Sequence, residues 1–183
     1  MSSRRKFLQQ SGLGLLSLLA SRLPVSGERR PSFGGLVVSE DEGEAFRLRD
    51  GSAIVRIKIA KTQGPVAISF LSESFSTGDE VPVHKHANED ELIFLHRGSG
   101  LLTFGEKEIQ VHEGAVALVP KGIWHGLKNT GSGDLEMRFG YTPSGFEGFF
   151  REVGTPINQP FVAKTKEQRK TIAAKWGMTY KNL

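Results

Sequence analysis

The 183-residue chain contains no cysteine. This absence excludes disulfide bonds, thiolate metal sites and cysteine nucleophiles, so any bound metal must be held by nitrogen and oxygen atoms. Internal repeats and low-complexity segments are also absent from the sequence. The length suits one domain better than two.

The body of the chain has no excess of positive charge, although the whole chain has a formal net charge of +4. Six of the 24 basic residues lie within residues 1–30, together with one of the 20 acidic residues, which leaves 18 basic and 19 acidic residues in 31–183. A nucleic-acid-binding domain normally carries a basic patch or stripe. We therefore expect no nucleic acid partner.

Two common catalytic signatures are missing as well. No nucleophile elbow is present, which argues against a serine hydrolase. The pair Gly98 and Gly100 does not lead into a helix with a Walker or Rossmann context, so it is typical of a β-turn and not of a phosphate-binding loop.

The N-terminal segment has the order of a bacterial export signal, with a basic start followed by a modestly apolar run. Residues 3–9, Ser-Arg-Arg-Lys-Phe-Leu-Gln, resemble the twin-arginine signal and depart from it at Gln9. The resemblance implies a periplasmic protein that engages the export machinery through residues 1–30. The apolar run is too short to span a membrane well, so we expect no stable membrane span in the mature protein. Whether the segment is cleaved near Ser26 or Gly27 stays open. The alternative to an export signal is the basic amphipathic start of an ordinary helix.

Residues 36–142 read as many short strands separated by turns. The stretch 53–60 alternates apolar and polar side chains with a period of two, and 64–75 is rich in β-branched and aromatic residues. Later strands are each bounded by Gly, Pro, Asn or Asp. This pattern predicts an all-β sandwich or barrel.

Helical patterns are confined to the C-terminal part. Residues 145–153 place Phe146, Phe149 and Phe150 on one side of a short helix, where they could cover a barrel mouth or form a dimer seam. Residues 165–177 have Thr165 as a candidate N-cap and Gly177 at the expected end.

The stretch HKHANEDE, residues 84–91, is a candidate metal-binding segment. Residues two apart in a strand point to the same face, so His84 and His86 can meet one ion while Lys85 points away. A hairpin turn at 87–90 would then place Glu91 beside them. The alternative is a solvated polar turn, because two histidines near a carboxylate are common on surfaces.

A second motif favours the metal site, and here the sequence resembles the cupin superfamily. The first cupin motif fits Gly78-x5-His84-x-His86-x4-Glu91-x6-Gly98. The second fits Gly114-x5-Pro120-x-Gly122-x2-His125-x3-Asn129, with fifteen residues between the two motifs. The segment after the last strand, YTPSGFEGFFREVGTP, is similar to small single-domain cupins described as quercetin-dioxygenase-like.

The resemblance implies a conical β-barrel of jelly-roll type, also called a double-stranded β-helix, with a short C-terminal helical segment. Its implied metal ligands are His84, His86, Glu91 and His125. Imidazole and carboxylate suit one divalent Fe, Mn, Ni, Cu or Zn ion per chain, whose identity the sequence does not give. The expected organisation is a signal and linker at 1–30, the barrel at 31–145 and a helical extension packing on it at 146–183.

Strand parity predicts the surroundings of this site. Ile93 and Leu95 should face inward with Glu91, and Leu127 and Asn129 with His125, which gives an apolar pocket. Met137 and Phe139 are candidates for a further wall, and Asn129 suits a turn better than the metal. The remaining histidines, His96 and His112, are expected to be structural or exposed.

The reaction is not fixed by the fold. The first hypothesis is a metal-dependent dioxygenase that acts on a small aromatic or enol-type substrate, with Glu91 as the catalytic base. The second is a non-catalytic periplasmic module that binds a ligand or a metal, and a sugar isomerase or epimerase ranks third. Whether the chain is an enzyme therefore stays open, and exposed sheet edges favour a homodimer.

Overall fold

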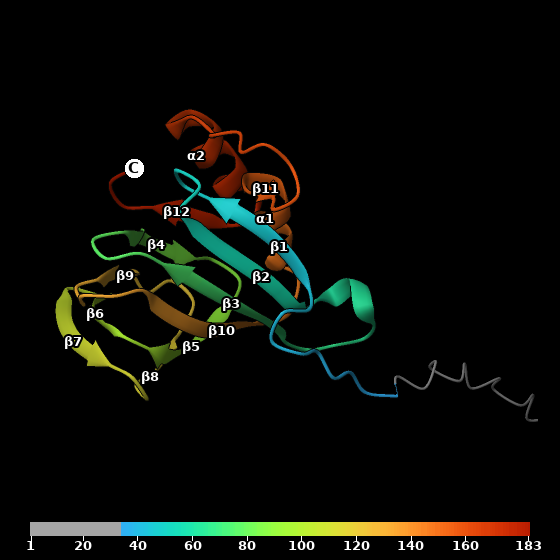
Figure 1. Cartoon of the computed structure of the whole chain (residues 1–183), viewed down its shortest axis with the longest axis horizontal. Coiled ribbons are helices and arrows are strands. Elements are labelled where there is room, and N and C mark those ends of the chain that lie inside the picture. The colour runs from blue at the N-terminus through green and yellow to red at the C-terminus, as the bar shows by residue number, and fades with distance from the viewer. Residues whose placement is uncertain (1–33) are drawn as a thin grey trace, which may run out of the picture. The chain divides into compact units, whose positions relative to one another are not determined.

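The computed structural model describes residues 34–183, which form two antiparallel β-sheets with two helices near the C-terminus (Figure 1). The predicted export signal, residues 1–30, lies outside the described residues. Within the described part, neither helix combines the length and the apolar character needed to cross a membrane.

The larger sheet has seven strands and contains the N-terminal strands of the described part. In spatial order they are β11 (Thr155–Pro156), β1 (Glu44–Leu48), β2 (Ala53–Ile59), β3 (Ser69–Phe75), β10 (Leu135–Thr142), β5 (Asp90–Arg97) and β8 (Val116–Val119).

The smaller sheet has five strands. In spatial order they are β12 (Met178–Tyr180), β4 (Glu80–His86), β9 (His125–Asn129), β6 (Ser99–Phe104) and β7 (Lys107–His112). Successive strands alternate between the two sheets at several points along the chain. This arrangement is the all-β jelly roll that the sequence predicted.

The period-two pattern of β2 holds for most of the strand and then breaks. Val55 and Ile57 are buried as predicted, but the pairing register between β2 and β3 shifts between Ile57 and Ile59. Lys58 is buried because the segment 39–42 covers it. Its ammonium group donates to the backbone carbonyls of Ser39 at 2.7 Å and Glu42 at 2.8 Å. Arg56 donates to the same segment, at the Asp41 carbonyl, so Lys58 is buried by a covering loop on the side of the strand that it shares with Arg56.

The C-terminal part contains α1 (Glu147–Val153) and α2 (Lys166–Lys175), and a short 3₁₀ turn, η1 (Lys61–Gln63), precedes β3. Thr165 caps α2 as predicted: its hydroxyl accepts from the Gln168 amide at 3.2 Å, and the Gln168 side chain accepts from the Thr165 amide at 2.9 Å. Gly177 follows the helix with φ of 70°, a conformation that suits glycine.

The sequence did not indicate two short strands in this part. β11 extends the larger sheet beside β1, and β12 extends the smaller sheet beside β4. The C-terminal residues thus join both sheets of the barrel, and the core includes side chains from both sheets and from α1.

Candidate metal centre

Four side chains meet in the interior between the sheets. His84 and His86 lie on β4, His125 begins β9 and Glu91 lies near the start of β5. One ligand atom from each lies within 4.8 Å of the others, and all four residues are at most 6% exposed. The structure therefore brings together the four residues that the two motifs selected.

The polar atoms of the cluster point at a common centre. Nε2 of His125 lies 2.8 Å from Oε2 of Glu91, and Nε2 of His86 lies 3.3 Å from the same oxygen. Nε2 of His84 lies 3.2 Å from Nε2 of His86. Three imidazole nitrogens and one carboxylate oxygen thus converge.

Backbone carbonyl groups orient two of the rings. Nδ1 of His84 lies 2.7 Å from the Pro82 oxygen, and Nδ1 of His125 lies 2.9 Å from the Ile123 oxygen. A proton on each Nδ1 makes these contacts hydrogen bonds and leaves Nε2 with a lone pair that faces the centre. A second hydrogen bond of this kind is usual for metal-binding histidines.

Glu91 reaches the centre by a different route from the one expected. The sequence suggested that β4 and β5 form a hairpin, but these strands lie in different sheets. The segment 87–89 carries the chain from one sheet to the other. Glu91 therefore approaches the histidines across the barrel interior, while His84 and His125 are partners on neighbouring strands.

Burial and mutual contact determine the charge state of the cluster. Burial, together with the neighbouring His125 and His86, lowers the pKa of His84 to about 3. Burial alone would raise the pKa of Glu91, but contacts with His125 and His86 outweigh it and hold this pKa below its usual range. A neutral imidazole and an ionised carboxylate are the forms that bind a metal ion.

These residues fit one divalent transition metal ion. The donors are nitrogen and oxygen, the set is buried, and two of the rings are held with Nε2 inward. Iron, manganese, nickel, copper and zinc all accept imidazole and carboxylate ligands. The donor set does not choose among them.

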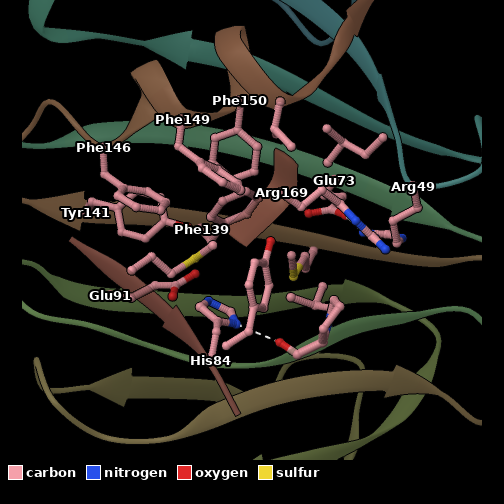
Figure 2. Close-up of a pocket in the computed structure, with 17 residues that line it drawn as sticks. Arg49, Glu73, His84, Glu91, Phe139, Tyr141, Phe146, Phe149, Phe150 and Arg169 are labelled. Atoms are coloured by element: carbon pink, nitrogen blue, oxygen red, sulfur yellow. Dashed lines mark hydrogen bonds and ion pairs between the residues drawn. The ribbon is translucent and has the colours of Figure 1, made fainter. Parts of the chain in front are cut away.

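A cavity of about 70 Å³ adjoins the centre. Figure 2 shows His84 and Glu91 at one side of this cavity, with a group of aromatic rings above them. Phe139, Tyr141, Phe146, Phe149 and Phe150 contribute these rings, and Met137 is also part of the lining. Met137 and Phe139 therefore form the wall that was predicted from the last barrel strand.

The aromatic residues of the α1 segment have a defined position. Phe146 packs edge-on against His86 with ring centroids 4.3 Å apart, and Phe149 stacks on Phe146 at 5.3 Å. These side chains cover the cavity within this chain. Of the two roles considered for them, the structure favours the cover over the barrel interior.

Two features of the site were missed at the sequence level. The pocket was expected to be apolar, yet Arg49, Glu73 and Arg169 also line it. Tyr141, which is paired with Glu91 across β10 and β5, was not identified either: burial and the Glu91 carboxylate raise the pKa of its phenol. Only its pairing with Glu91 would have pointed to Tyr141 as a site residue, and that pairing is known only when the strand order is known.

The other predictions from parity hold. Ile93, Leu95 and Leu127 are buried, although they line a different cavity from the one beside the cluster, whereas His96 and His112 are exposed. Asn129 serves a turn: its side chain donates to the Gly133 oxygen at 2.9 Å and accepts from the Gly131 amide at 3.0 Å.

Comparison with known proteins agrees with this description. The cupin domain family matches residues 72–140. The oxalate-binding protein of Thermotoga maritima is 34% identical over 68 residues, which cover 37% of this chain and 56% of that protein. The chain spans about half the length of the curated relatives it matches first.

Solved structures share the fold at lower identity. A predicted oxalate decarboxylase of Thermotoga maritima is 24% identical, covers 59% of this chain and 99% of its own, and superimposes with a TM-score of 0.54. The polyketide cyclase RemF of Streptomyces resistomycificus is 15% identical, covers 74% and 91% of the two chains, and gives 0.54. Residues 72–140 thus match the cupin domain family, and the two sheets of the described part have the all-β jelly-roll fold of these solved structures.

Proposed function

We propose that the protein is a metal-dependent dioxygenase of the quercetin-dioxygenase-like kind, acting on a small aromatic or enol-type substrate. The observation that carries the proposal is the cavity that adjoins the buried cluster and is walled by aromatic rings. A redox-active ion held by His84, His86, Glu91 and His125 would supply Lewis acidity and access to oxygen chemistry.

The residues around the cavity suit such a reaction. The aromatic wall from β10 and α1 excludes water and offers flat surfaces to a planar substrate. The ionised Glu91 carboxylate can accept the proton of a substrate hydroxyl at an oxygen, and its depressed pKa favours return of that proton later. Tyr141 lies opposite Glu91 on the neighbouring strand, where its phenol can orient this carboxylate.

Oxygen uptake tests this proposal directly. Protein loaded separately with iron, manganese, nickel or copper would be assayed with quercetin, small catechols and 1,3-diketones. Glu91→Gln keeps the shape of the side chain and removes the base, so uptake should fall by about 10²- to 10⁴-fold while metal is retained. Full activity of this variant would refute the base role, and no uptake by any loaded form with any member of the panel would refute the dioxygenase.

The second candidate function is ligand binding without reaction. It is favoured by the relative named as an oxalate-binding protein, which shares sequence with this cupin domain. A ligand that binds the metal-loaded protein in air and is recovered chemically unchanged would support this candidate against the first.

We also propose that the protein acts in the periplasm after twin-arginine export, because residues 3–9 resemble that signal. Replacing both Arg4 and Arg5 by lysine should keep the full-length chain in the cytoplasm. An unchanged periplasmic fraction in this variant would contradict the proposal.

A further inference from the structure

The cavity beside the candidate metal centre also has a charged side. Arg49, Glu73 and Arg169 line it together with the histidine and aromatic residues. Figure 2 shows Arg49 and Glu73 across the cavity from His84 and Glu91. Neither arginine belongs to a cupin motif, and Arg169 comes from the C-terminal helix α2.

The guanidinium of Arg49 is held in one orientation by two carboxylates. Its Nη1 lies 2.7 Å from Glu73, and its Nε lies 3.0 and 3.1 Å from the two oxygens of Asp79. The third nitrogen, Nη2, is buried and has no hydrogen-bond partner among residues 34–183. Arg49 also has φ of 55°, the one positive value at a non-glycine position in that part of the chain. Such strained positions often lie at functional sites.

Arg169 presents a second unsatisfied donor to the same cavity. Its Nε is buried and has no hydrogen-bond partner within the described residues. Tyr180 also lines the cavity: burial raises the pKa of its phenol, and the charges of Arg169 and Arg49 both act against that rise. The two guanidinium groups thus act on one part of the cavity.

Buried donors without partners are uncommon and costly, so each requires a physical explanation. Water in the cavity could accept from both groups, but it would not balance the charge of Arg169, which has no ion-pair partner within the described residues. With a divalent cation at the cluster, the ion and the two arginines would carry four positive charges, against three carboxylates from Glu73, Glu91 and Asp79. Negative charge is therefore what this cavity lacks.

We propose that Arg49 and Arg169 receive a carboxylate group of the substrate, whose remaining part extends past the aromatic wall toward the four-residue cluster. This proposal rests on the proposed function, because it names the substrate class for the same cavity. The ligand is a small organic acid with a hydroxyl, oxo or enol oxygen beside its carboxylate.

The shape of the site favours a carboxylate over a phosphate. Guanidinium groups bind planar carboxylates through paired N–H donors. A cavity of about 70 Å³ suits a compact molecule. A single negative charge also sits better than two beside Glu73, which is 3% exposed.

Binding measured without turnover tests this assignment. Metal-loaded protein under anaerobic conditions would be titrated by calorimetry with oxamate and with its neutral counterpart oxamide, and then with salicylate and salicylamide. At least one acid should bind, and about ten- to hundredfold more tightly than its amide, the range expected for a charge-assisted hydrogen bond.

Arg169→Gln should remove most of this preference, lowering the affinity of the acid by about tenfold or more. The matched control is Lys170→Gln, which removes the same charge from the adjacent exposed position of α2 and should leave binding unchanged. Replacing Arg49 alone would leave the buried Glu73 carboxylate without its ion-pair partner. Arg49 is therefore tested in the double variant Arg49→Gln with Glu73→Gln, which removes both charges together. This double variant should also lose the preference for the acid.

Several results would overturn the assignment. They are equal binding of acid and amide by the wild-type protein, absence of binding for both acids, or wild-type affinity in folded Arg169→Gln. Tight binding of inorganic phosphate with the same loss in Arg169→Gln would replace carboxylate by phosphate. Oxygen uptake is measured separately, so acid binding without oxygen consumption would refute the dioxygenase and leave the carboxylate site standing.

Discussion

Oε2 of Glu91 lies 2.8 Å from Nε2 of His125, although 34 residues separate them in the chain. Glu91 comes from the larger sheet and His125 from the smaller one, so this contact forms only when the two sheets close over the interior. The candidate metal centre thus joins the two layers of the barrel.

Metal binding should therefore stabilise the whole barrel. The folded protein should carry about one transition metal ion per chain, and removing it with a chelator should lower the midpoint of thermal unfolding, because an ion at a hundred times its dissociation constant contributes about 2.7 kcal/mol. His84→Ala combined with His125→Ala should abolish both the metal and the effect of the chelator, as elemental analysis and calorimetry would show. A well-folded wild-type protein from its native source without metal would contradict this prediction.

Tyr141→Phe should weaken metal binding without abolishing it. Tyr141 is paired with Glu91 on the neighbouring strand and its phenol interacts with that carboxylate. Loss of a partner that orients a ligand typically costs about 10- to 100-fold in metal affinity. Competition with a chromophoric chelator would measure the change. Tyr180→Phe makes the same chemical change away from Glu91 and should leave the metal affinity as in the wild type. Equal affinities for all three proteins would argue that Tyr141 does not position the ligand.

Gly148→Ala should destabilise the protein, although this change usually stabilises a helix. A Cβ at position 148 would collide with the ring of Trp176, which is held by a 3.0 Å hydrogen bond to Glu152. Displacing the ring should cost about 1–3 kcal/mol, measurable by denaturant unfolding. Gly133→Ala is the control, because no atom lies within 4 Å of its added Cβ. Trp176 is the C-cap residue of α2, so Gly148→Ala should also weaken acid binding at Arg169. An increase in stability would refute the close packing of the two helices.

The alkaline titration of the metal-free protein should lack an ordinary tyrosine. The chain has two tyrosines, and burial raises the pKa of Tyr180 to about 12 and that of Tyr141 well above its usual value. Since both folded values are raised, the unfolded phenols ionise first. The stability they contribute is complete below their reference pKa of 10.0 and is lost as the pH rises through about 12. Phenolate absorbance should rise only together with unfolding, and a tyrosine that titrates near pH 10 in the folded protein would disprove this.

Much of the candidate centre can be read from the sequence, because its ligands follow local rules. The spacing of His84 and His86 places both on one face of a strand in any fold that keeps the strand. The second motif adds His125 at a fixed distance from a turn. The caps of α2 at Thr165 and Gly177 are equally local, since the side chain and the backbone conformation act within one turn of helix.

Other features depend on which strands become neighbours. The sequence suggested a hairpin from β4 to β5, whereas Glu91 lies in the opposite sheet and faces the histidines across the interior. The position of Tyr141 opposite Glu91 follows from the pairing of β10 with β5, which the sequence does not give. Lys58 in β2 is buried because the segment 39–42 covers it, and strand alternation does not predict that contact.

The sequence by itself determined the ligand types, their spacing and the β-rich class, because these depend on side-chain chemistry and on strand periodicity. Only the tertiary structure decided what surrounds the ligands. Arg49, Glu73 and Arg169 are far apart in the chain, and no local pattern predicts that they line one cavity. Their meeting depends on sheet closure and on the docking of α2, and both are set by the burial of apolar surface contributed by the whole described chain.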